Sequence, residues 1–296
     1  MSKVIVRIKG GLGNQLFCYA AARRLALVNN SELIIDGVTG FVRDHQYHRK
    51  YALDCFNIKA RKATSYERME PFERYRRALA KFIARQRPFD LRSYLEQEGL
   101  DFDARLLDYR FKRGTVYLDG LWQSENYFKD IEEIIRQDLR ITPPKDEVSR
   151  RMAERILSCN AVAVHVRFFD KPNNNNAFYN LRENYYLRAT REILSRVEKP
   201  HFFLFSDNLD VARRTVKLPE DQVTCVDQNR GEGQACADLW LMTQCKHFII
   251  ANSTFSWWGA WLGAERKKIV IAPNYKTYGK TAWGFKGLIP DRWVKI

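Results

Sequence analysis

The chain has 296 residues, 45% of them hydrophobic and 29% charged, which suits one large globular domain or two medium ones and excludes disordered and fibrous proteins. No apolar run approaches the ~18 residues that a membrane-spanning helix needs. Lys and Arg number 50 against 35 Asp and Glu, and this excess of +15 attracts phosphorylated ligands, nucleic acid or an anionic membrane surface.

The first half of the chain begins as an alternation of strand and helix and then becomes irregular. Its predicted elements are a strand at 4–8, a glycine turn, a helix at 15–28, a strand at 32–36, an irregular segment at 37–60, a helical pattern within 66–87, a strand at 116–118 and a helix at 124–139. Pro143 and Pro144 end that helix, and a polar helix at 146–157 follows. We therefore expect a boundary within 140–160 that separates domains 1–155 and 156–296.

The second half alternates short apolar runs with amphipathic stretches. Strands are predicted at 161–167, 201–205, 223–226, 247–251 and 268–272, with helices at 183–197, 209–216, 235–245 and 255–263 between them. This order predicts an α/β domain with a doubly wound parallel sheet and helices on both faces.

Polar residues follow four of these strands, at the edge of the sheet where ligands of such folds bind. They are His165 and Arg167, then Ser206, Asp207 and Asn208, then Asp227, and then Asn252, Ser253 and Thr254. For Asn208 and Asp227 an ordinary role in turns and helix caps is the stronger interpretation. A guanidinium directly after a buried strand needs an anionic partner, and phosphate suits Arg167 best. The helix that begins at 252–254 offers a second site for an anion.

A glycine-rich loop at Lys9–Gln15 lies between the first strand and the first helix. It is not the GxGxxG motif of dinucleotide-binding proteins, because Leu16 occupies the place of the last glycine, and no Gly-Lys-Ser/Thr of a P-loop follows. A tight structural turn and a ligand-binding loop both remain open here.

Five motifs resemble the bacterial α-1,2-fucosyltransferases of glycosyltransferase family 11. They are GGLGNQLF at 10–17, GLWQSENYF at 120–128, HVR at 165–167, FSD at 205–207 and IANSTFSWWGAWL at 250–262. The resemblance spans nearly the whole chain. It implies a GT-B type fold, α/β, with two Rossmann-like domains facing each other across a cleft, an N-terminal domain on the acceptor side and a C-terminal domain that binds the nucleotide sugar.

The activity that the resemblance implies is transfer of L-fucose from GDP-fucose to the 2-hydroxyl of a terminal galactoside, with inversion, during synthesis of a surface glycan such as O-antigen or capsule. Neither a metal nor another cofactor is expected, which agrees with the absence of an Asp-x-Asp motif at a strand end. A family-11-like transferase that uses another nucleotide sugar or another acceptor is the alternative.

The resemblance also implies roles for individual residues. Arg167 would hold the leaving β-phosphate, with His165 and Asp170 in the same catalytic motif. Donor-binding residues would be Gly11, Gly13, Asn14, Arg167, Ser206, Asp207, Asp238, Asn252, Ser253, Thr254 and Phe255, and acceptor-binding residues would be Trp122 and Gln123. The catalytic base stays unassigned among His165, Asp36, His45 and His48. Phe168 and Lys171 depart from the family's His-x-Arg-Arg-x-Asp-Tyr motif, which leaves the donor sugar open.

The tryptophans have a structural and a functional interpretation. Trp257 and Trp261 lie four residues apart on one helix face, which is typical of core packing. Trp122 is the better candidate for a platform on which the acceptor sugar stacks, and Trp283 is another.

Residues 59–92 are strongly basic, with eleven Lys and Arg against four Asp and Glu, and they include an apolar stripe at helical spacing. A solvated helix with its apolar face in the core is the commoner explanation. The other is peripheral contact with an anionic membrane, which would suit a lipid-linked galactoside acceptor. Because the N-terminus lacks a secretory signal, we expect a cytoplasmic protein, and the second interpretation would place it on the inner membrane.

Two other classes of protein fit less well. A basic nucleic-acid-binding protein would explain the charge, but no RRM, KH or helix-turn-helix signature is present, so we expect no nucleic-acid partner. An NAD-dependent dehydrogenase would explain the glycine turn, but it needs the GxGxxG motif that this loop lacks.

Overall fold

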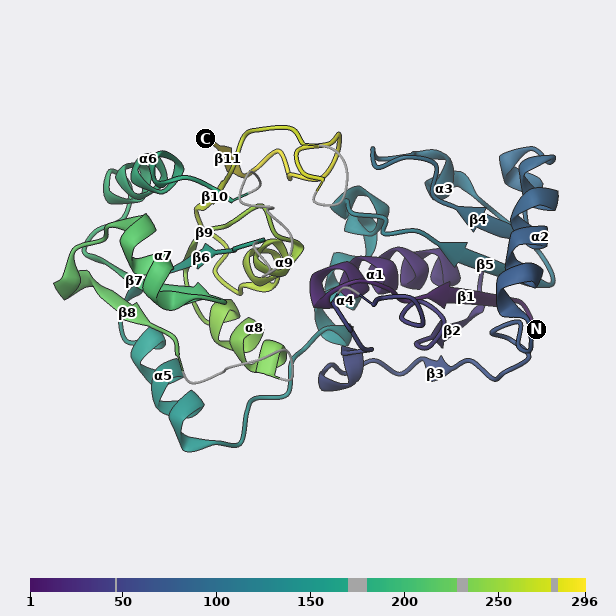
Figure 1. Cartoon of the computed structure of the whole chain (residues 1–296), viewed down its shortest axis with the longest axis horizontal. Helices are drawn as coiled ribbons and strands as arrows, with labels where there is room; N and C mark the ends of the chain where they lie inside the picture. Colours follow the sequence, from purple (N-terminus) through teal and green to yellow (C-terminus); the bar gives the residue numbers. More distant parts are fainter. Residues whose placement is uncertain (46, 170–179, 228–233, 278–281) are drawn as a thin grey trace. The chain divides into compact units, whose positions relative to one another are not determined.

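The computed structural model describes residues 1–45, 47–169, 180–227, 234–277 and 282–296, and the chain folds as two compact units (Figure 1). The first unit is Met1–Arg140 with Phe285–Leu288, and the second is Ile141–Gly284 with Ile289–Ile296. The division after Arg140 lies within the predicted window of 140–160. The helix at 147–157 therefore belongs with the second unit, although the predicted domain limits of 1–155 and 156–296 assign it to the first.

The first unit contains a five-stranded sheet in the order β3-β2-β1-β5-β4, and all of its pairs are parallel. Its strands are β1 (Lys3–Arg7), β2 (Glu32–Asp36), β3 (Arg61–Lys62), β4 (Tyr94–Glu96) and β5 (Thr115–Asp119). Its helices are α1 (Leu12–Val28), α2 (Glu73–Arg85), α3 (Arg105–Asp108) and α4 (Glu132–Asp138), with 3-10 turns η1 (Leu53–Cys55), η2 (Phe89–Leu91), η3 (Glu125–Tyr127) and η4 (Lys129–Ile131). Figure 1 shows α1 lying along this sheet and α2 standing next to β4.

Two predicted helices of the first unit differ from the structure. The single helix expected at 124–139 is wrong: Ser124 accepts a hydrogen bond from the Asn126 N–H and so starts only η3, and regular helix begins at Glu132. The helical pattern within 66–87 forms only from Glu73, after Pro71 and after Phe72, which has a left-handed φ of 69°. A residue in the left-handed backbone conformation cannot continue an α-helix, so the helix starts directly after Phe72.

The second unit contains a six-stranded parallel sheet in the order β11-β10-β9-β6-β7-β8, as the alternating pattern of this half predicted. Its strands are β6 (Asn160–Val166), β7 (Pro200–Ser206), β8 (Val223–Cys225), β9 (His247–Ile249), β10 (Val270–Ala272) and β11 (Val294–Lys295). Its helices are α5 (Glu147–Leu157), α6 (Glu183–Leu194), α7 (Leu209–Val216), α8 (Ala235–Thr243) and α9 (Thr254–Leu262), with the 3-10 turn η6 (Glu220–Gln222).

Side chains of β6 alternate between the two faces of this sheet. Val162, Val164 and Val166 pack with α6 and α7 in one buried cluster. His165 lies on the opposite face, where its ring contacts Phe255 of α9 at a centroid distance of 5.6 Å. Figure 1 shows α6 and α7 on one side of the strands and α8 and α9 on the other. Within the described ranges, no helix is both long enough and apolar enough to cross a bilayer.

Candidate active site

The sheet of the second unit has its topological switch point between β6 and β9. From β6 the chain continues on one side to β7 and β8, and on the other side β9, β10 and β11 follow. At such a point the connections after the two strands diverge and leave a crevice at their carboxyl ends, where open α/β sheets bind ligands. Arg167 follows β6 directly, and Asn252, Ser253 and the start of α9 follow β9.

Arg167 forms an ion pair with Asp207, which follows the neighbouring strand β7. The Arg167 Nη1 lies 3.1 Å from the Asp207 Oδ2, and the other carboxylate oxygen of Asp207 accepts a hydrogen bond from the Phe168 N–H at 3.2 Å. The side chains of Arg167 and Asp207 are 37% and 36% exposed. One carboxylate therefore holds both the guanidinium, through Nη1, and the backbone after β6. A guanidinium has five N–H donors, so Arg167 can pair with Asp207 and still donate hydrogen bonds to a phosphate.

His165 is buried near the end of β6, two residues before Arg167. Its side chain is 6% exposed, and burial together with the charge of Arg167 lowers its pKa to about 3. Within the described residues its Nδ1 has no hydrogen-bond partner. The imidazole is therefore neutral at physiological pH and a weak base, which favours an orienting role over that of general base.

The start of α9 supplies the second group of predicted donor-binding residues. Ser253 is the N-cap, and its hydroxyl accepts a hydrogen bond from the Phe255 N–H at 3.3 Å. Asn252 is buried beside it, and the first turn contains no acidic residue. A helix N-terminus with free N–H groups and no carboxylate favours an anion. Because Ser253 caps the helix, its hydroxyl is engaged before any ligand binds.

Other predicted donor residues of the second unit have different surroundings. Ser206 hydrogen-bonds the Asn208 N–H, and Asn208 caps α7, which is the ordinary turn chemistry expected for Asn208. Asp238 lies in the first turn of α8 and is half-buried. Asp170 and Lys171 fall outside the described residues.

The glycine loop of the first unit occupies the equivalent place, after β1 and before α1. Gly10 has a φ of 79°, which only glycine adopts easily, and a Cβ at this position would lie 2.7 Å from the Asn14 Nδ2. Gln15 is buried and bonds the Gly10 and Lys50 carbonyls, each at 2.9 Å. Asn14 in turn accepts a hydrogen bond from the predicted acceptor residue Gln123 at 2.7 Å. The loop is thus braced from several sides, and Gly11 is the N-cap of α1.

A network of charges at the same edge of the first sheet was not foreseen from the sequence. Asp119, at the end of β5, is 1% exposed and accepts bonds from the Lys9 ammonium at 2.8 Å and the Tyr94 hydroxyl at 2.9 Å. Lys81 and Arg7 lie 3.0 and 3.5 Å from it. These cations hold the pKa of Asp119 well below its usual range in spite of burial. The only sequence signal was a lone carboxylate at a strand end.

A second buried carboxylate, Asp36 at the end of β2, is also fully engaged. It accepts hydrogen bonds from the Thr39 N–H at 2.9 Å and from the Thr39 hydroxyl, and Arg77 approaches it to 3.5 Å. These bonds explain its burial and argue against Asp36 as a catalytic base.

The structure supports the core interpretation of the tryptophans but not the sugar-platform interpretation. Trp257, Trp258 and Trp261 are fully buried, which confirms the core interpretation of α9. Trp122 is only 1% exposed and packs edge-on against Tyr127. Trp283 is 2% exposed and donates its indole N–H to the Pro273 carbonyl. Neither ring offers an exposed face to a sugar in this structure, so the platform interpretation lacks structural support.

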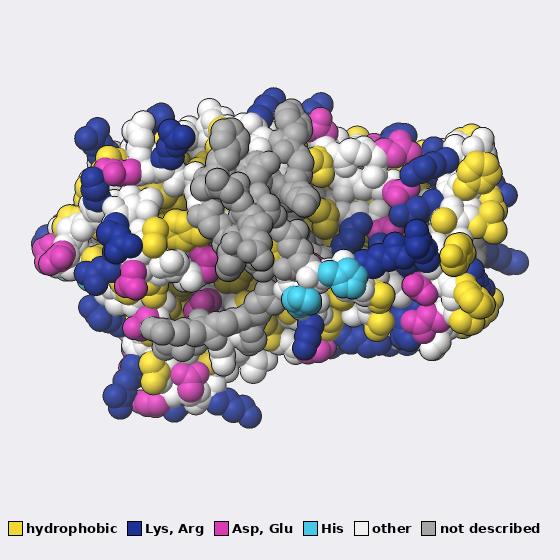
Figure 2. All heavy atoms as spheres, viewed as in Figure 1, with side chains coloured by type: hydrophobic (Ala, Val, Ile, Leu, Met, Phe, Trp, Pro, Cys, Tyr) yellow, Lys and Arg dark blue, Asp and Glu magenta, His cyan; other side chains and the backbone are white. Residues whose placement is uncertain are grey.

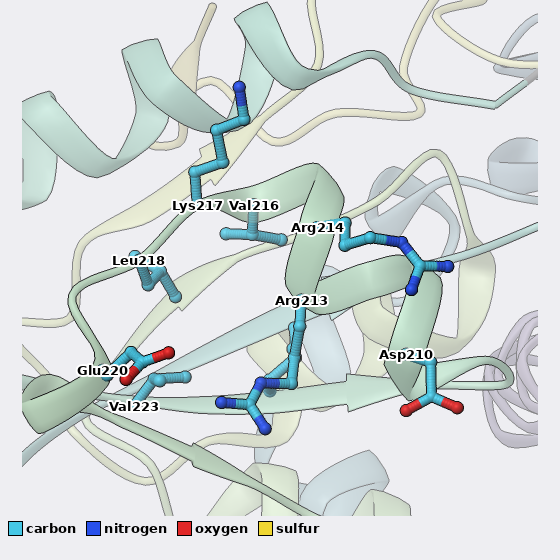
Figure 3. Close-up of a pocket in the computed structure, with 9 residues that line it drawn as sticks. Asp210, Arg213, Arg214, Val216, Lys217, Leu218, Glu220 and Val223 are labelled. Atoms are coloured by element: carbon cyan, nitrogen blue, oxygen red, sulfur yellow. The ribbon is translucent and has the colours of Figure 1, made fainter.

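The second unit also contains a cavity of about 440 Å³ away from the switch point. Its lining comes from α7, β7, β8 and the connection between them, and Figure 3 shows the Lys217 and Arg214 side chains pointing away from one another. It shares no lining residue with the cluster around Arg167. Across the described ranges, no three His, Cys, Asp or Glu side chains gather in a way that could hold a metal ion.

The sequence matches the family model of glycosyl transferase family 11 over residues 3–282. The chain belongs to glycosyltransferase family 11. An α-1,2-colitosyltransferase of Escherichia coli is 31% identical to it, with the match covering all of this chain and 99% of that enzyme. The O-antigen biosynthesis glycosyltransferase WbnK, also of Escherichia coli, is 28% identical over 98% of this chain and 99% of the relative. The predicted family is therefore confirmed, and the chain is a glycosyltransferase.

Solved structures confirm the GT-B type α/β fold. Fucosyltransferase NodZ from Bradyrhizobium shares it with a TM-score of 0.53 and 18% identity, over 87% of this chain and 91% of that one. A mutant of FUT1 from Arabidopsis thaliana in complex with GDP gives a TM-score of 0.53 and 12% identity, over 94% of this chain and 71% of that one. At such low identity these structures support the fold alone.

Proposed function

We propose that this family 11 glycosyltransferase transfers L-fucose from GDP-fucose to the 2-hydroxyl of a terminal galactoside, with inversion and without a metal ion, in synthesis of a surface glycan. The observation that carries the proposal is Arg167, held by Asp207 at the switch point of the second sheet beside the start of α9. The colitosyltransferase name of one relative supports the α-1,2 linkage, and the O-antigen name of the other supports the glycan class.

In the proposed reaction the bond between the sugar C1 and the β-phosphate oxygen breaks as the galactose 2-hydroxyl attacks C1 from the opposite face. Negative charge builds on the departing GDP, and the Arg167 guanidinium with the N–H groups at the start of α9 would stabilise it. Since these groups are already in place, little reorganisation is needed. The proton of the attacking hydroxyl goes to a base that is not yet assigned, and the neutral His165 would hold the loop after β6 in position.

The donor sugar has a second candidate for a specific reason. The related colitosyltransferase transfers a sugar that lacks the 3-hydroxyl of fucose, and Phe168 stands in this chain where the family motif has a second arginine. An apolar residue in place of a hydrogen-bond donor removes a partner that a sugar hydroxyl could use. GDP-colitose is therefore the alternative donor.

The test is product analysis with both donors. Purified protein is incubated in EDTA with GDP-fucose or GDP-colitose and with lactose, N-acetyllactosamine or galactosyl-N-acetylgalactosamine, and the products are analysed by mass spectrometry and NMR. We expect an α-1,2-linked deoxyhexose on galactose from GDP-fucose. A product only from GDP-colitose would support the alternative donor, and turnover that needs a divalent ion would refute the metal-free proposal.

A further inference from the structure

Helix α2 places its large apolar side chains in solvent. Phe72, Tyr75, Leu79 and Phe82 are 71%, 70%, 59% and 63% exposed. The side that contacts the sheet carries no large apolar residue: Ala80 and Ala84 are its apolar contacts and pack against Met69, Tyr94 and Tyr117. The expectation that the apolar stripe of this segment lies in the core is therefore wrong, because the helix turns Ala80 and Ala84 towards the core and leaves its large apolar side chains exposed.

Basic residues border this apolar face. Helix α2 contains four arginines and one lysine against one acidic residue, Glu73. In Figure 2 yellow hydrophobic side chains lie among dark blue ones over α2. Contiguous exposed apolar surface is rare on soluble proteins and marks an interaction site. Aromatic and leucine side chains flanked by arginine are typical of helices that lie in a membrane interface.

A cavity of about 190 Å³ lies beside the same helix, at the carboxyl edge of the first sheet. Five of the residues that line it are basic and one is acidic: Arg7, Arg43, Arg74, Arg77, Lys81 and Glu73. Three of the cations are fixed in place. Arg7 and Arg77 bond Thr39 at 2.8 and 2.9 Å, and Lys81 lies 3.0 Å from the buried Asp119.

The remaining two cations that line the cavity, Arg43 and Arg74, are exposed, and no carboxylate within the described residues lies in ion-pair distance of either. Preorganised guanidinium groups together with two unneutralised ones suit a phosphate group, which accepts bidentate hydrogen bonds from arginine.

We propose that α2 lies on an anionic bilayer, with its apolar face inserted among the lipids, and that the adjacent basic cavity receives the phosphate of a lipid headgroup. Both features involve α2, and they suit the two ends of one molecule: the apolar face suits an acyl chain and the basic cavity suits a phosphate. A lipid satisfies both, whereas a soluble phosphate leaves the apolar face uncovered and an apolar protein partner leaves the cavity unused. The proposal does not depend on which sugar the enzyme transfers.

The test measures sedimentation of the full chain with phosphatidylcholine vesicles that contain or lack phosphatidylglycerol. Leu79→Ser with Phe82→Ser removes apolar contact, and Arg43→Gln with Arg74→Gln removes the two free cations. The matched controls lie on α5: Val148→Ser with Leu157→Ser, where both residues are 59% exposed, and Arg150→Gln with Arg151→Gln, which changes the net charge equally.

We expect the wild type to bind the anionic vesicles, to bind neutral ones roughly tenfold or more weakly, and to be released by salt. Each α2 or cavity variant should bind at least about tenfold more weakly, with both controls unchanged. All these positions are exposed, so the variants should keep their thermal unfolding midpoints and their turnover of a soluble galactoside. Failure of the transferase proposal would appear as absent turnover with vesicle binding intact.

Three results would overturn the proposal. One is equal binding to neutral and anionic vesicles, or equal loss in the α5 controls. Another is binding of inorganic pyrophosphate that depends on Arg43 and Arg74 without any vesicle binding, which would make the ligand a soluble phosphate. The third is a dimer in lipid-free solution that Leu79→Ser with Phe82→Ser dissociates, which would make α2 an interface between two copies of the chain.

Discussion

Arg167 and Asp207 follow adjacent parallel strands, and their side chains meet at 3.1 Å where those strands end. Through its second oxygen, Asp207 also holds the Phe168 N–H. The carboxylate therefore fixes the direction of the guanidinium and the path of the backbone behind it. An arginine that binds phosphate without rearrangement needs a neighbouring residue to fix its side chain, and Asp207 can do so for Arg167.

Asp207→Asn should impair the enzyme less than loss of Arg167 itself. The amide can still accept the Phe168 hydrogen bond, but it no longer attracts the guanidinium by charge, so Arg167 becomes more mobile. We expect kcat/KM to fall roughly tenfold, about 1.4 kcal/mol, through both kcat and KM. Steady-state kinetics would measure this, with Asp210→Asn as the control, at an acidic residue on α7 that lines the separate cavity of this unit. Unchanged kinetics would show that Asp207 does not position Arg167.

The buried His165 predicts an acid-sensitive fold. Because its pKa is about 3 when folded and about 6.5 when unfolded, the unfolded chain binds a proton that the folded chain does not between these values. The stability that this residue contributes is fully present above pH ~6.5 and is lost as the pH falls towards 3, by about 1.4 kcal/mol for each unit.

The free energy of unfolding, measured with denaturant at pH 7 and pH 5, should therefore change less with pH in His165→Gln than in the wild type. His45→Gln, at an exposed histidine, should keep the wild-type pH dependence of the free energy of unfolding. An equal pH dependence in all three proteins would mean that folding does not lower the pKa of His165.

Gly10→Ala should disturb the glycine loop for a steric reason. The added methyl group would sit 2.7 Å from the Asn14 Nδ2, at a residue that bonds Gln123, and the positive φ adds strain. Gly114 has a φ of 97°, and no atom of the described residues lies within 4 Å of the place that a Cβ would take, so Gly114→Ala carries the strain without the collision.

We expect both substitutions to cost about 1 kcal/mol of unfolding free energy from backbone strain, and Gly10→Ala to cost about 1–3 kcal/mol more and to lower turnover. Chemical denaturation and kinetic assays of the two variants would measure the difference. If Gly10→Ala and Gly114→Ala behave alike, the loop is not held by Asn14.

Asp119→Asn should destabilise the first unit strongly. The substitution keeps the shape of the side chain but leaves Arg7, Lys9 and Lys81 without their shared buried counter-charge, at a cost of about 3–5 kcal/mol. Because the pKa of Asp119 is depressed in the fold, its contribution is present above its unfolded pKa and is lost as the pH falls through the acid range.

The variant should thus unfold at lower denaturant concentration at pH 7 and show a smaller further loss in acid. Asp54→Asn, at a carboxylate that is 78% exposed and pairs with Lys62, should change stability by under about 1 kcal/mol. Similar losses for both variants would contradict the account of the buried network.

The alternation of strands and helices in the second half made its sheet predictable, because parallel strands place their carboxyl ends along one edge. Arg167, Asp207 and Ser253 could be assigned to that edge from the sequence for this reason. The first unit was less accessible. Tyr94, Lys81 and Arg7 meet Asp119 from separate parts of the chain, and no local pattern records such a meeting.

Sequence patterns also could not predict which side chains are buried. The spacing of Leu79 and Phe82 reveals an apolar stripe, but spacing cannot say whether that stripe or the opposite alanine face meets the sheet. Trp122 follows a strand, as a sugar platform would, and yet the packing of Tyr127 against it closes off its ring. Both questions depend on which elements pack together, which the fold alone decides.

The most direct measurement of the central claim is calorimetry with GDP in the presence of EDTA, on the wild type, Arg167→Ala and Arg266→Ala, the last at an exposed arginine that follows α9. We predict that the wild type and Arg266→Ala bind GDP with equal affinity, and that Arg167→Ala binds it about 10- to 100-fold more weakly, as the loss of a charge-assisted hydrogen bond worth about 1.5–3 kcal/mol requires. GDP affinity that survives in Arg167→Ala, or wild-type binding that appears only when a divalent ion is added, would contradict the account.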